Sequence, residues 1–167
     1  MNIIVAIDKN KGIGKDNELL AHISPDLKYF KRKTLNKVIV MGYNTYMSLP
    51  KRPLPDRLNI VLTTKNIELD GALVVNSLDS LIKKITELEN KGNEVFICGG
   101  AKIYEQLLPY ADKLYITHIM SEFDADIFFP NYEDKFNLTW IYGSKTNLSH
   151  KHPHIFTEYT RVTKQKT

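Results

Sequence analysis

Short apolar runs separated by helical patterns constrain the fold of this chain more than any other feature of its sequence. Four of them lie at residues 3–7 (IIVAI), 38–42 (VIVMG), 59–64 (NIVLTT) and 94–98 (EVFIC). Such runs are typical of strands with both faces buried, which occur in parallel sheets covered by helices. Two further strand-like runs, at 136–143 and 154–162, come last and favour a closing antiparallel pair. The order predicts an α/β fold whose sheet is mostly parallel with an antiparallel C-terminal edge.

The segments between these runs supply the expected helices and shorter strands. Helices are predicted at 25–35, 44–49, 78–90 and 101–108, and further strands at 72–75 and 113–119. The clearest helix is 78–90, where apolar residues recur at the spacing of an amphipathic helix. Ser77 is its predicted N-cap and Gly92 its predicted C-terminal stop. Residues 9–24 are predicted to form a long loop, of the kind that often covers a ligand.

The length of the chain suits one domain. A chain of about 150 residues buries about 70% of its unfolded surface, and this one has 167 residues without a linker or repeat. Its single cysteine, Cys98, suits a reducing cytosol. The first ten residues lack a signal-peptide pattern, and no stretch approaches the roughly 20 apolar residues of a membrane span. A cytoplasmic protein without a membrane partner is expected.

The net charge of +4 raises the question of a nucleic-acid partner. The lysines and arginines are scattered, however, and form no basic stripe interleaved with aromatic residues. A small polyanionic ligand explains the charge equally well, so no nucleic-acid partner is expected.

Three predicted strand ends carry small or hydroxylated residues beside a helix start or a lysine. Gly99 and Gly100 separate a strand from a helix in FICGGAKIYEQL, where backbone N–H groups are able to bind a phosphate. Taken alone, this pair is more often a tight turn, and it is not the G-x-G-x-x-G of a Rossmann domain. Thr63, Thr64 and Lys65 follow a second strand, and Gly42 and Thr45 flank the end of a third. Together they indicate an extended, phosphorylated ligand such as a dinucleotide.

Asp26 in SPDLKYFK has two readings. As a capping arrangement, Ser24 is the N-cap, Pro25 the first helical residue and Asp26 a carboxylate at the positive end of the helix dipole. As a ligand site, Asp26 binds a flat amidine-like ring by two parallel hydrogen bonds, with Leu27 and Phe30 beside it. Arg57 likewise is either a clamp for a carboxylate or an ordinary solvated arginine.

Eight blocks in order carry a resemblance to a known family. They are IVAID, GIG, SPDLKYFK, VIVMG, RPLPDRLNIVLTT, VFICGGAKIYEQLLP, KLYITHI and DADIFFP. Over essentially its whole length the chain resembles a bacterial dihydrofolate reductase. The resemblance implies an eight-stranded sheet with about four helices, and an adenosine-binding subdomain at roughly 37–92. It also implies a monomer that reduces 7,8-dihydrofolate with NADPH in one-carbon metabolism and binds antifolate-type small molecules.

The resemblance also implies roles for individual residues. Asp26 matches the catalytic carboxylate that holds the pterin, with Thr117 bonded to it, and Arg57 matches the clamp for the glutamate carboxylate. The other implied substrate residues are Ile4, Val5, Ala6, Leu27, Phe30, Lys31, Leu49, Arg52, Leu54 and Cys98. The implied cofactor residues are Ala6, Ile13, Gly14, Gly42, Tyr43, Asn44, Thr45, Leu62, Thr63, Thr64, Lys65, Asn76, Cys98, Gly99, Gly100, Ala101, Lys102, Ile103 and Tyr104. The Gly99–Gly100 peptide is expected to be cis.

Chemically, Asp26 then holds the ring and acts through its charge, while water delivers a proton to N5. Burial raises the pKa of such a carboxyl, whereas Thr117 and the helix dipole lower it, and the sequence does not decide between them. Two rivals are weighed against this reading. One is a reductase of the same fold acting on a riboflavin-pathway pyrimidine, and the other, from a different class, is a folate- or nucleotide-binding structural protein that has lost turnover.

Two departures from the family pattern carry predictions. Leu20-Ala21 stand where most bacterial members have Pro-Trp, which predicts a looser closed loop. Tyr43-Asn44 stand where the family usually has Arg or another basic residue followed by His or Lys, which predicts a weaker preference for NADPH over NADH. Lys65 and Lys102 remain as partners for the phosphates.

Other features have ordinary readings. HKHPH at 150–154 is read as a solvated hairpin loop and no metal site is predicted, because no Cys, Asp or Glu completes the set of ligands. Cys98 is read as a buried strand residue and not as a nucleophile. Tyr104 is either plain core or part of the nicotinamide pocket. Asp124 and Asp126 either cap a turn or bind the covering loop.

Overall fold

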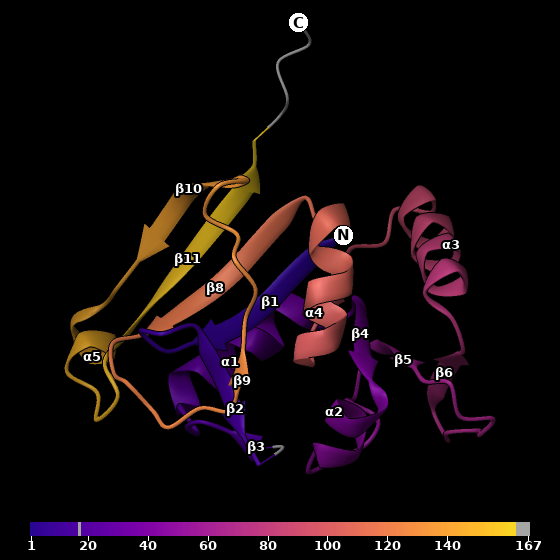
Figure 1. Cartoon of the computed structure of the whole chain (residues 1–167), viewed down its shortest axis with the longest axis horizontal. Coiled ribbons are helices and arrows are strands. Elements are labelled where there is room, and N and C mark those ends of the chain that lie inside the picture. The colour runs from indigo at the N-terminus through magenta and orange to yellow at the C-terminus, as the bar shows by residue number, and fades with distance from the viewer. Residues whose placement is uncertain (17, 163–167) are drawn as a thin grey trace, which may run out of the picture.

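An eight-stranded sheet with helices on both faces organises the molecule, seen in a computed structural model that describes residues 1–16 and 18–162 (Figure 1). From edge to edge its strands are β10 (Phe136–Tyr142), β11 (His154–Arg161), β8 (Lys113–Ile119), β1 (Asn2–Ile7), β7 (Val95–Ile97), β4 (Val38–Gly42), β5 (Leu58–Leu62) and β6 (Ala72–Val75). The helices are α1 (Ser24–Thr34), α2 (Tyr43–Ser48), α3 (Leu78–Asn90), α4 (Ala101–Leu107), the 3₁₀ turn η1 (Leu108–Tyr110) and α5 (Lys145–Leu148).

The sheet topology confirms the predicted α/β class. The pairings from β8 through β6 are all parallel, and only β11 with β8 and β10 with β11 are antiparallel. Strands β1 and β7 lie side by side in the sheet. The chain runs from β1 across to β4 on one side and from β7 across to β8 on the other, so the order of the strands reverses between β1 and β7. Such a reversal opens a crevice at the carboxyl ends of the two strands, where open α/β sheets bind their ligands.

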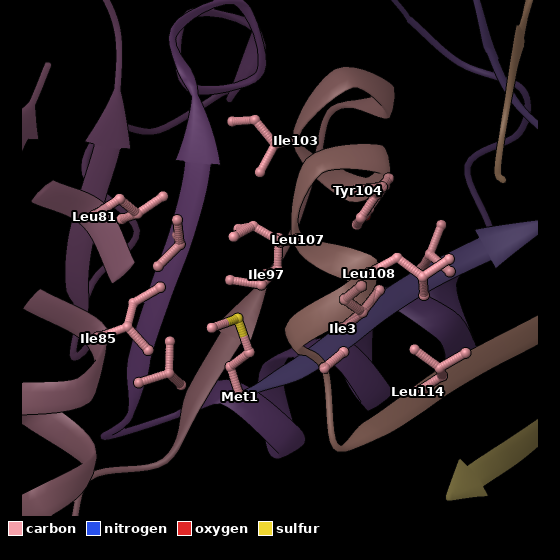
Figure 2. Close-up of a cluster of buried hydrophobic side chains, with 14 of the residues drawn as sticks. Met1, Ile3, Leu81, Ile85, Ile97, Ile103, Tyr104, Leu107, Leu108 and Leu114 are labelled. Carbon is pink, nitrogen blue, oxygen red and sulfur yellow. The ribbon is translucent and has the colours of Figure 1, made fainter. Parts of the chain in front are cut away.

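Two apolar cores form because the central strands are buried on both faces. One core lies under α3 and α4 and contains Ile3 and Ile97 of the sheet with Leu81, Ile85 and Leu107 of the helices (Figure 2). The other lies under α1 and α2, where Tyr29 and Tyr46 meet residues of the opposite face such as Ile39, Met41 and Phe96. Every second residue of a strand faces the same side, so one continuous apolar run supplies both cores.

Helix α3 has the predicted bounds because both of its ends are encoded locally. The Ser77 hydroxyl accepts a hydrogen bond from the Ser80 backbone N–H, which confirms the N-cap. Gly92 has φ +89, a conformation that favours glycine, and its N–H donates to the Glu89 carbonyl. The predicted stop is confirmed.

Helix α1 begins one residue earlier than its predicted cap allows, so the assignment of Ser24 as N-cap is wrong. Ile23 is the N-cap, and its carbonyl accepts from the N–H groups of Asp26 and Leu27. Ile23 is also buried, so its packing fixes the helix start in place of a side-chain cap. Asp26 still lies in the first turn.

The segment 9–24 is not the irregular loop predicted from its glycines. It contains β2 (Gly12–Lys15) and β3 (Glu18–Leu19), which form a three-stranded sheet with β9 (Ile127–Phe128). We call residues 9–22 the covering segment. Buried Asp8 holds it in place, because one carboxylate oxygen accepts from the N–H groups of Asn10 and Gly12 and the other from the N–H of Phe123.

Smaller differences concern short elements. The structure has five α-helices in its described part where about four were expected, and α5 and η1 were not predicted. β5 ends at Leu62, so Thr63 and Thr64 follow the strand, and β7 ends at Ile97, so Cys98 follows it. Among the described residues no helix has the length and apolar character needed to cross a membrane.

Candidate functional site

Asp26 and Thr117 meet at the start of α1. Asp26 is half-buried, and Oδ1 accepts a hydrogen bond from the hydroxyl of buried Thr117 at 2.6 Å. Thr117 lies on β8 opposite Ala6 of β1, beside the reversal in the sheet. The two residues are far apart in sequence, and the contact implied by the family resemblance is present.

Burial is the largest influence on the pKa of Asp26 and raises it above its ordinary value. The Thr117 hydrogen bond and the nearby charge of His154 both lower it, but together they do not cancel the cost of removing the carboxylate from water. The question that the sequence left open is therefore answered in favour of burial. A capping carboxylate in contact with water would have no reason for this shift.

Several predicted substrate residues gather in the core beside Asp26. Five of them pack against the cluster under α1 and α2 or belong to it: Ile4, Phe30, Leu49, Leu54 and Cys98. Leu27 is 48% exposed and stays outside this cluster. Burial raises the pKa of the Cys98 thiol to about 12, which keeps it protonated and supports the prediction that it is not a nucleophile.

Arg57 is partly exposed, and two hydrogen bonds orient its guanidinium. Its Nε donates to the Pro55 carbonyl at 2.9 Å, and Nη1 donates to the Thr34 hydroxyl at 3.1 Å. The guanidinium also lies 6.0 Å from the centre of the Phe30 ring. These contacts use two of the five N–H donors, and Nη2 binds no acceptor in the described part of the chain. The group is oriented and retains the donors that a carboxylate needs.

The predicted diglycine lies against α2 and α4. The Gly99–Gly100 peptide is cis, as the resemblance implies, and the Gly99 carbonyl accepts from the Gly42 N–H at 2.9 Å. Gly99 has φ +131, which disfavours any residue with a side chain. A Cβ at Gly100 would lie 3.3 Å from the Thr45 hydroxyl. Backbone and small side chains therefore converge at the ends of β4 and β7, two of the three strand ends that were predicted to meet.

Tyr104 connects this region to the first strand. Its hydroxyl donates to the Ile4 carbonyl at 2.8 Å, and its ring is buried among the core residues under α4 (Figure 2). The residue is thus part of the core and also contacts a predicted substrate residue. The Ile4 carbonyl has a second lone pair for a further donor.

A second group of predicted cofactor residues lies beyond the ends of β5 and β6. The Asn76 amide donates to the carbonyls of Thr63 and Lys65, and the Lys65 N–H donates to the Thr63 hydroxyl. The Lys65 ammonium lies 4.1 Å from the centre of the Tyr43 ring, a cation–π contact. Tyr43 therefore orients the Lys65 ammonium, which is one of the two lysines predicted to bind the phosphates.

Other predicted residues are less closely tied to this arrangement. Val5 points into the core under α4, so only its backbone faces the site. Ile13 packs against that same core. Leu62 is half-buried at the end of β5, and Ala101 is half-buried at the start of α4. Gly14 is buried in the covering segment, and its carbonyl accepts from the Asp126 N–H. Ile103 is buried in the core under α4. The remaining ones are exposed side chains: Lys31, Asn44, Arg52, Thr64 and Lys102.

The covering segment is bound by the acidic residues left undecided above. Asp126 accepts from the Asp16 N–H, and Asp124 forms an ion pair with Lys15. The reading in which Asp124 and Asp126 bind this segment is confirmed. Sequence reasoning missed Asp8, whose position directly after an apolar run was the only signal.

The HKHPH stretch differs from its prediction. His150 and His152 are half-buried in a bend, but His154 begins β11 and is fully buried, so the solvated-loop reading is wrong for His154. Within residues 1–16 and 18–162, no cluster of three or more His, Cys, Asp or Glu side chains has the arrangement to hold a metal ion.

Two surface hollows lie outside the arrangement around Asp26. One of about 300 Å³ lies between the covering segment and Phe123–Asp124, and one of about 280 Å³ lies behind Arg57 near Asn36 and Asn93. Neither is lined by Asp26 or by the diglycine. The site is therefore defined by its contacts and its position in the sheet.

Comparison with known proteins gives consistent matches. The family model described as Dihydrofolate reductase matches residues 1–161. A dihydrofolate reductase of Bacillus subtilis is 40% identical over 93% of this chain and 90% of that protein. One of Buchnera aphidicola, from Acyrthosiphon pisum, is 43% identical over 80% of each chain. The solved dihydrofolate reductase of Enterococcus faecalis, complexed with NADP(H) and RAB-propyl, has a TM-score of 0.85 and 31% identity, covering 97% of this chain and 96% of that one.

Proposed function

The chain belongs to the dihydrofolate reductase family, and from this premise we propose which of its residues carry out the reaction. The enzyme reduces 7,8-dihydrofolate to 5,6,7,8-tetrahydrofolate with NADPH as its cofactor. Asp26 binds the pterin, Arg57 binds the carboxylate of the substrate tail, and the diglycine region with the ends of β4 and β5 binds the dinucleotide. The observation that carries the assignment is the half-buried Asp26 carboxylate bonded to Thr117.

The residues at the strand ends fit a phosphorylated dinucleotide. The chain bends around Gly99 and Gly100 without side chains, and a Cβ at Gly42 would lie 3.0 Å from the Ile103 side chain. No side chain caps the first N–H groups of α2 or α4. Thr45, Thr63 and Lys65 add hydroxyl and ammonium donors, which suit phosphate oxygens. Bound NADPH supplies the hydride to the substrate.

Asp26 binds and orients the pterin without donating a proton to it. An ionised carboxylate offers two acceptor oxygens to an amidine-like edge, and its charge favours the protonated form of the substrate. Thr117 fixes the carboxylate, since a hydroxyl that donates to Oδ1 prevents it from rotating. Water delivers the proton to N5, and the protein contributes orientation and charge.

We propose that Tyr43 and Lys65 determine the preference for NADPH. Replacing Lys65 with Gln is expected to lower kcat/KM for NADPH about fivefold, because an exposed ammonium–phosphate contact contributes roughly 1 kcal/mol. NADH lacks the 2′-phosphate of NADPH that Lys65 is proposed to bind, so the kcat/KM for NADH should stay unchanged. Tyr43→Leu should reproduce part of the loss, because the ring holds the ammonium at 4.1 Å.

The matched comparison is Lys102→Gln, which removes an equally exposed lysine from the first turn of α4. Initial rates with both cofactors should show a smaller loss for this variant. A fivefold loss in Lys102→Gln with none in Lys65→Gln would move the phosphate partner from the loop after β5 to α4. A native preference as strong as that of Arg-bearing relatives would contradict the expected weakening.

The remaining assignments extend the same proposal. We propose that residues 37–92 form the adenosine-binding subdomain, that the enzyme is a cytoplasmic monomer, and that it has no nucleic-acid partner. The riboflavin-pathway rival is set aside because the family model extends over residues 1–161. Loss of NADPH absorbance that requires added dihydrofolate tests the proposed activity. A protein that binds both molecules without oxidising NADPH would be the folate-binding rival.

A further inference from the structure

His154 is a fully buried histidine with one nitrogen that has no partner. Its Nδ1 lies 2.8 Å from the His152 carbonyl oxygen. A carbonyl only accepts, so Nδ1 carries a proton and Nε2 is the nitrogen whose protonation is free to change. Nε2 is buried without a hydrogen-bond partner. Such an atom is costly in a core, so its presence requires a physical reason.

The strand register places His154 on the sheet face that α1 covers. β11 pairs with β8 so that Phe156 lies opposite Thr117 and His154 opposite Ile119. Directly paired residues and alternate residues of a strand share a face, so His154, Phe156 and Thr117 point the same way. Thr117 binds Asp26 on that face, and Phe156 stacks on Tyr29, one turn after Asp26, at 4.2 Å.

The ring of His154 continues this layer beneath the start of α1. It meets the Phe156 ring edge-on at 5.5 Å. The polar groups on this face are Asp26, Tyr29 and Arg32 from α1, Tyr115 and Thr117 from β8 and Glu158 from β11, and Tyr104 approaches Asp26 from α4 on the other face of the sheet. His150 approaches from the preceding bend, with its ring centre 5.5 Å from that of His154. Asp26 is the carboxylate whose pKa the charge of His154 lowers, whereas Glu158 lies beyond Phe156 on β11, next to Tyr29 and Tyr115.

We propose that His154 is a positioning residue for Asp26, forming with it an acid–base pair in which protonation of the imidazole favours the ionised carboxylate. The inference rests on the proposed role of Asp26 as the ligand-binding acid. When the pair holds one proton between Nε2 and the carboxyl group, two forms exist. One is a neutral imidazole with a carboxylic acid, and the other is an imidazolium with a carboxylate. Only the second form presents a charged acceptor to the pterin.

Electrostatics supports this arrangement. The charge of His154 is among the influences that lower the pKa of Asp26, opposing the larger effect of burial. Two opposite charges behind a low-dielectric layer of aromatic rings are screened less than in water. Burial disfavours an imidazolium, and a proton on Nε2 has no acceptor among the described residues, so the negative charge of Asp26 is the compensation that this pair requires.

Two variants of His154 test the pair. His154→Asn keeps a donor for the His152 carbonyl, and His154→Phe keeps a ring against Phe156, but neither titrates. In enzyme with ¹³C-labelled aspartate carboxyl carbons, the Asp26 signal is identified from its loss in Asp26→Asn. Its midpoint is expected to rise by about half a pH unit or more in both variants, because the charge that lowers it is gone. The midpoint of the pH profile of hydride transfer should move as well.

The matched control is His118→Phe on the neighbouring strand, where His118 pairs with the Tyr159 hydroxyl at 2.9 Å. This variant should leave the Asp26 midpoint unchanged. An unchanged midpoint in a folded His154 variant overturns the inference, as does a lowered one. If neither variant folds, the wild-type enzyme decides: the His154 and Asp26 signals must share the same two midpoints, and independent single midpoints refute the pair. Activity lost in Asp26→Asn but unaltered titration in the His154 variants would leave the proposed function standing alone.

Discussion

Replacing Asp26 with Asn is expected to lower the rate of hydride transfer by about 10² to 10³-fold, the range for loss of one preorganised electrostatic group in an active site. The amide keeps the shape of the carboxylate and still accepts from Thr117, but it offers one acceptor oxygen where the pterin edge needs two. It also removes the charge that favours the protonated substrate. Single-turnover measurement of NADPH oxidation isolates this step from product release.

The same variant should unfold at a higher temperature than the wild type. A carboxyl whose pKa is raised by folding binds its proton more tightly in the folded state, so stability is fully present below the unfolded pKa and declines as pH rises through the folded pKa. At neutral pH the ionised Asp26 therefore destabilises the fold, and Asn removes that cost. Thermal unfolding followed by circular dichroism at neutral and acidic pH should show a gain that shrinks as the pH falls.

Asp134→Asn is the matched control, because Asp134 is an exposed acid far along the chain. It should change neither the hydride-transfer rate nor the pH dependence of unfolding. Near-normal single-turnover rates in Asp26→Asn would rule out the proposed role. A lower unfolding temperature at neutral pH would show that Asp26 instead stabilises the helix as a capping carboxylate.

The second large effect is expected at Arg57. Arg57→Leu should raise KM for dihydrofolate about 30- to 100-fold with little change in kcat, because loss of one partner from a charged hydrogen-bonded pair costs roughly 2 kcal/mol or more. Arg57 is proposed to bind the carboxylate of the substrate tail, which is remote from the reacting ring. The ground state and the transition state therefore lose the same binding energy in the variant. Steady-state kinetics with saturating NADPH separates the two constants.

A substrate analogue without the glutamate carboxylates provides the control for Arg57. The wild-type enzyme and Arg57→Leu should bind it equally, since the interaction in question is missing from both complexes. Arg52→Leu removes a more exposed arginine that donates to the Met47 carbonyl, and it should have a smaller effect on KM. An equal loss of affinity for the analogue would mean that Arg57 acts by packing on Phe30.

The predictability of each element followed from how local its determinants are. Helix α3 was predicted at its observed bounds because Ser77 and Gly92 specify both ends within the segment itself. The start of α1 was misplaced because Pro25 is compatible with either of the first two helical positions, and the choice depends on the packing of Ile23. β2 and β3 were missed because short strands gain their stability from β9, more than a hundred residues away.

The site shows the same distinction. Small residues at the ends of β4 and β7 indicated a phosphorylated ligand from sequence alone. The residues left two readings of Asp26, because its partner Thr117 lies on a distant strand and burial decides its pKa. His154 was misread since HKHPH is polar locally, whereas its burial comes from β8 and α1.

The three N–H groups gathered by Asp8 have a consequence for exchanging parts between relatives. The Asp8 carboxylate binds the backbone N–H groups of Gly12 and Phe123 at once, so the segments around these two residues depend on each other for their position despite their separation along the chain. A chimaera in which only one of these segments comes from a homologue would place one of the two N–H groups incorrectly relative to Asp8. The exchange should succeed when both segments are taken from the same homologue.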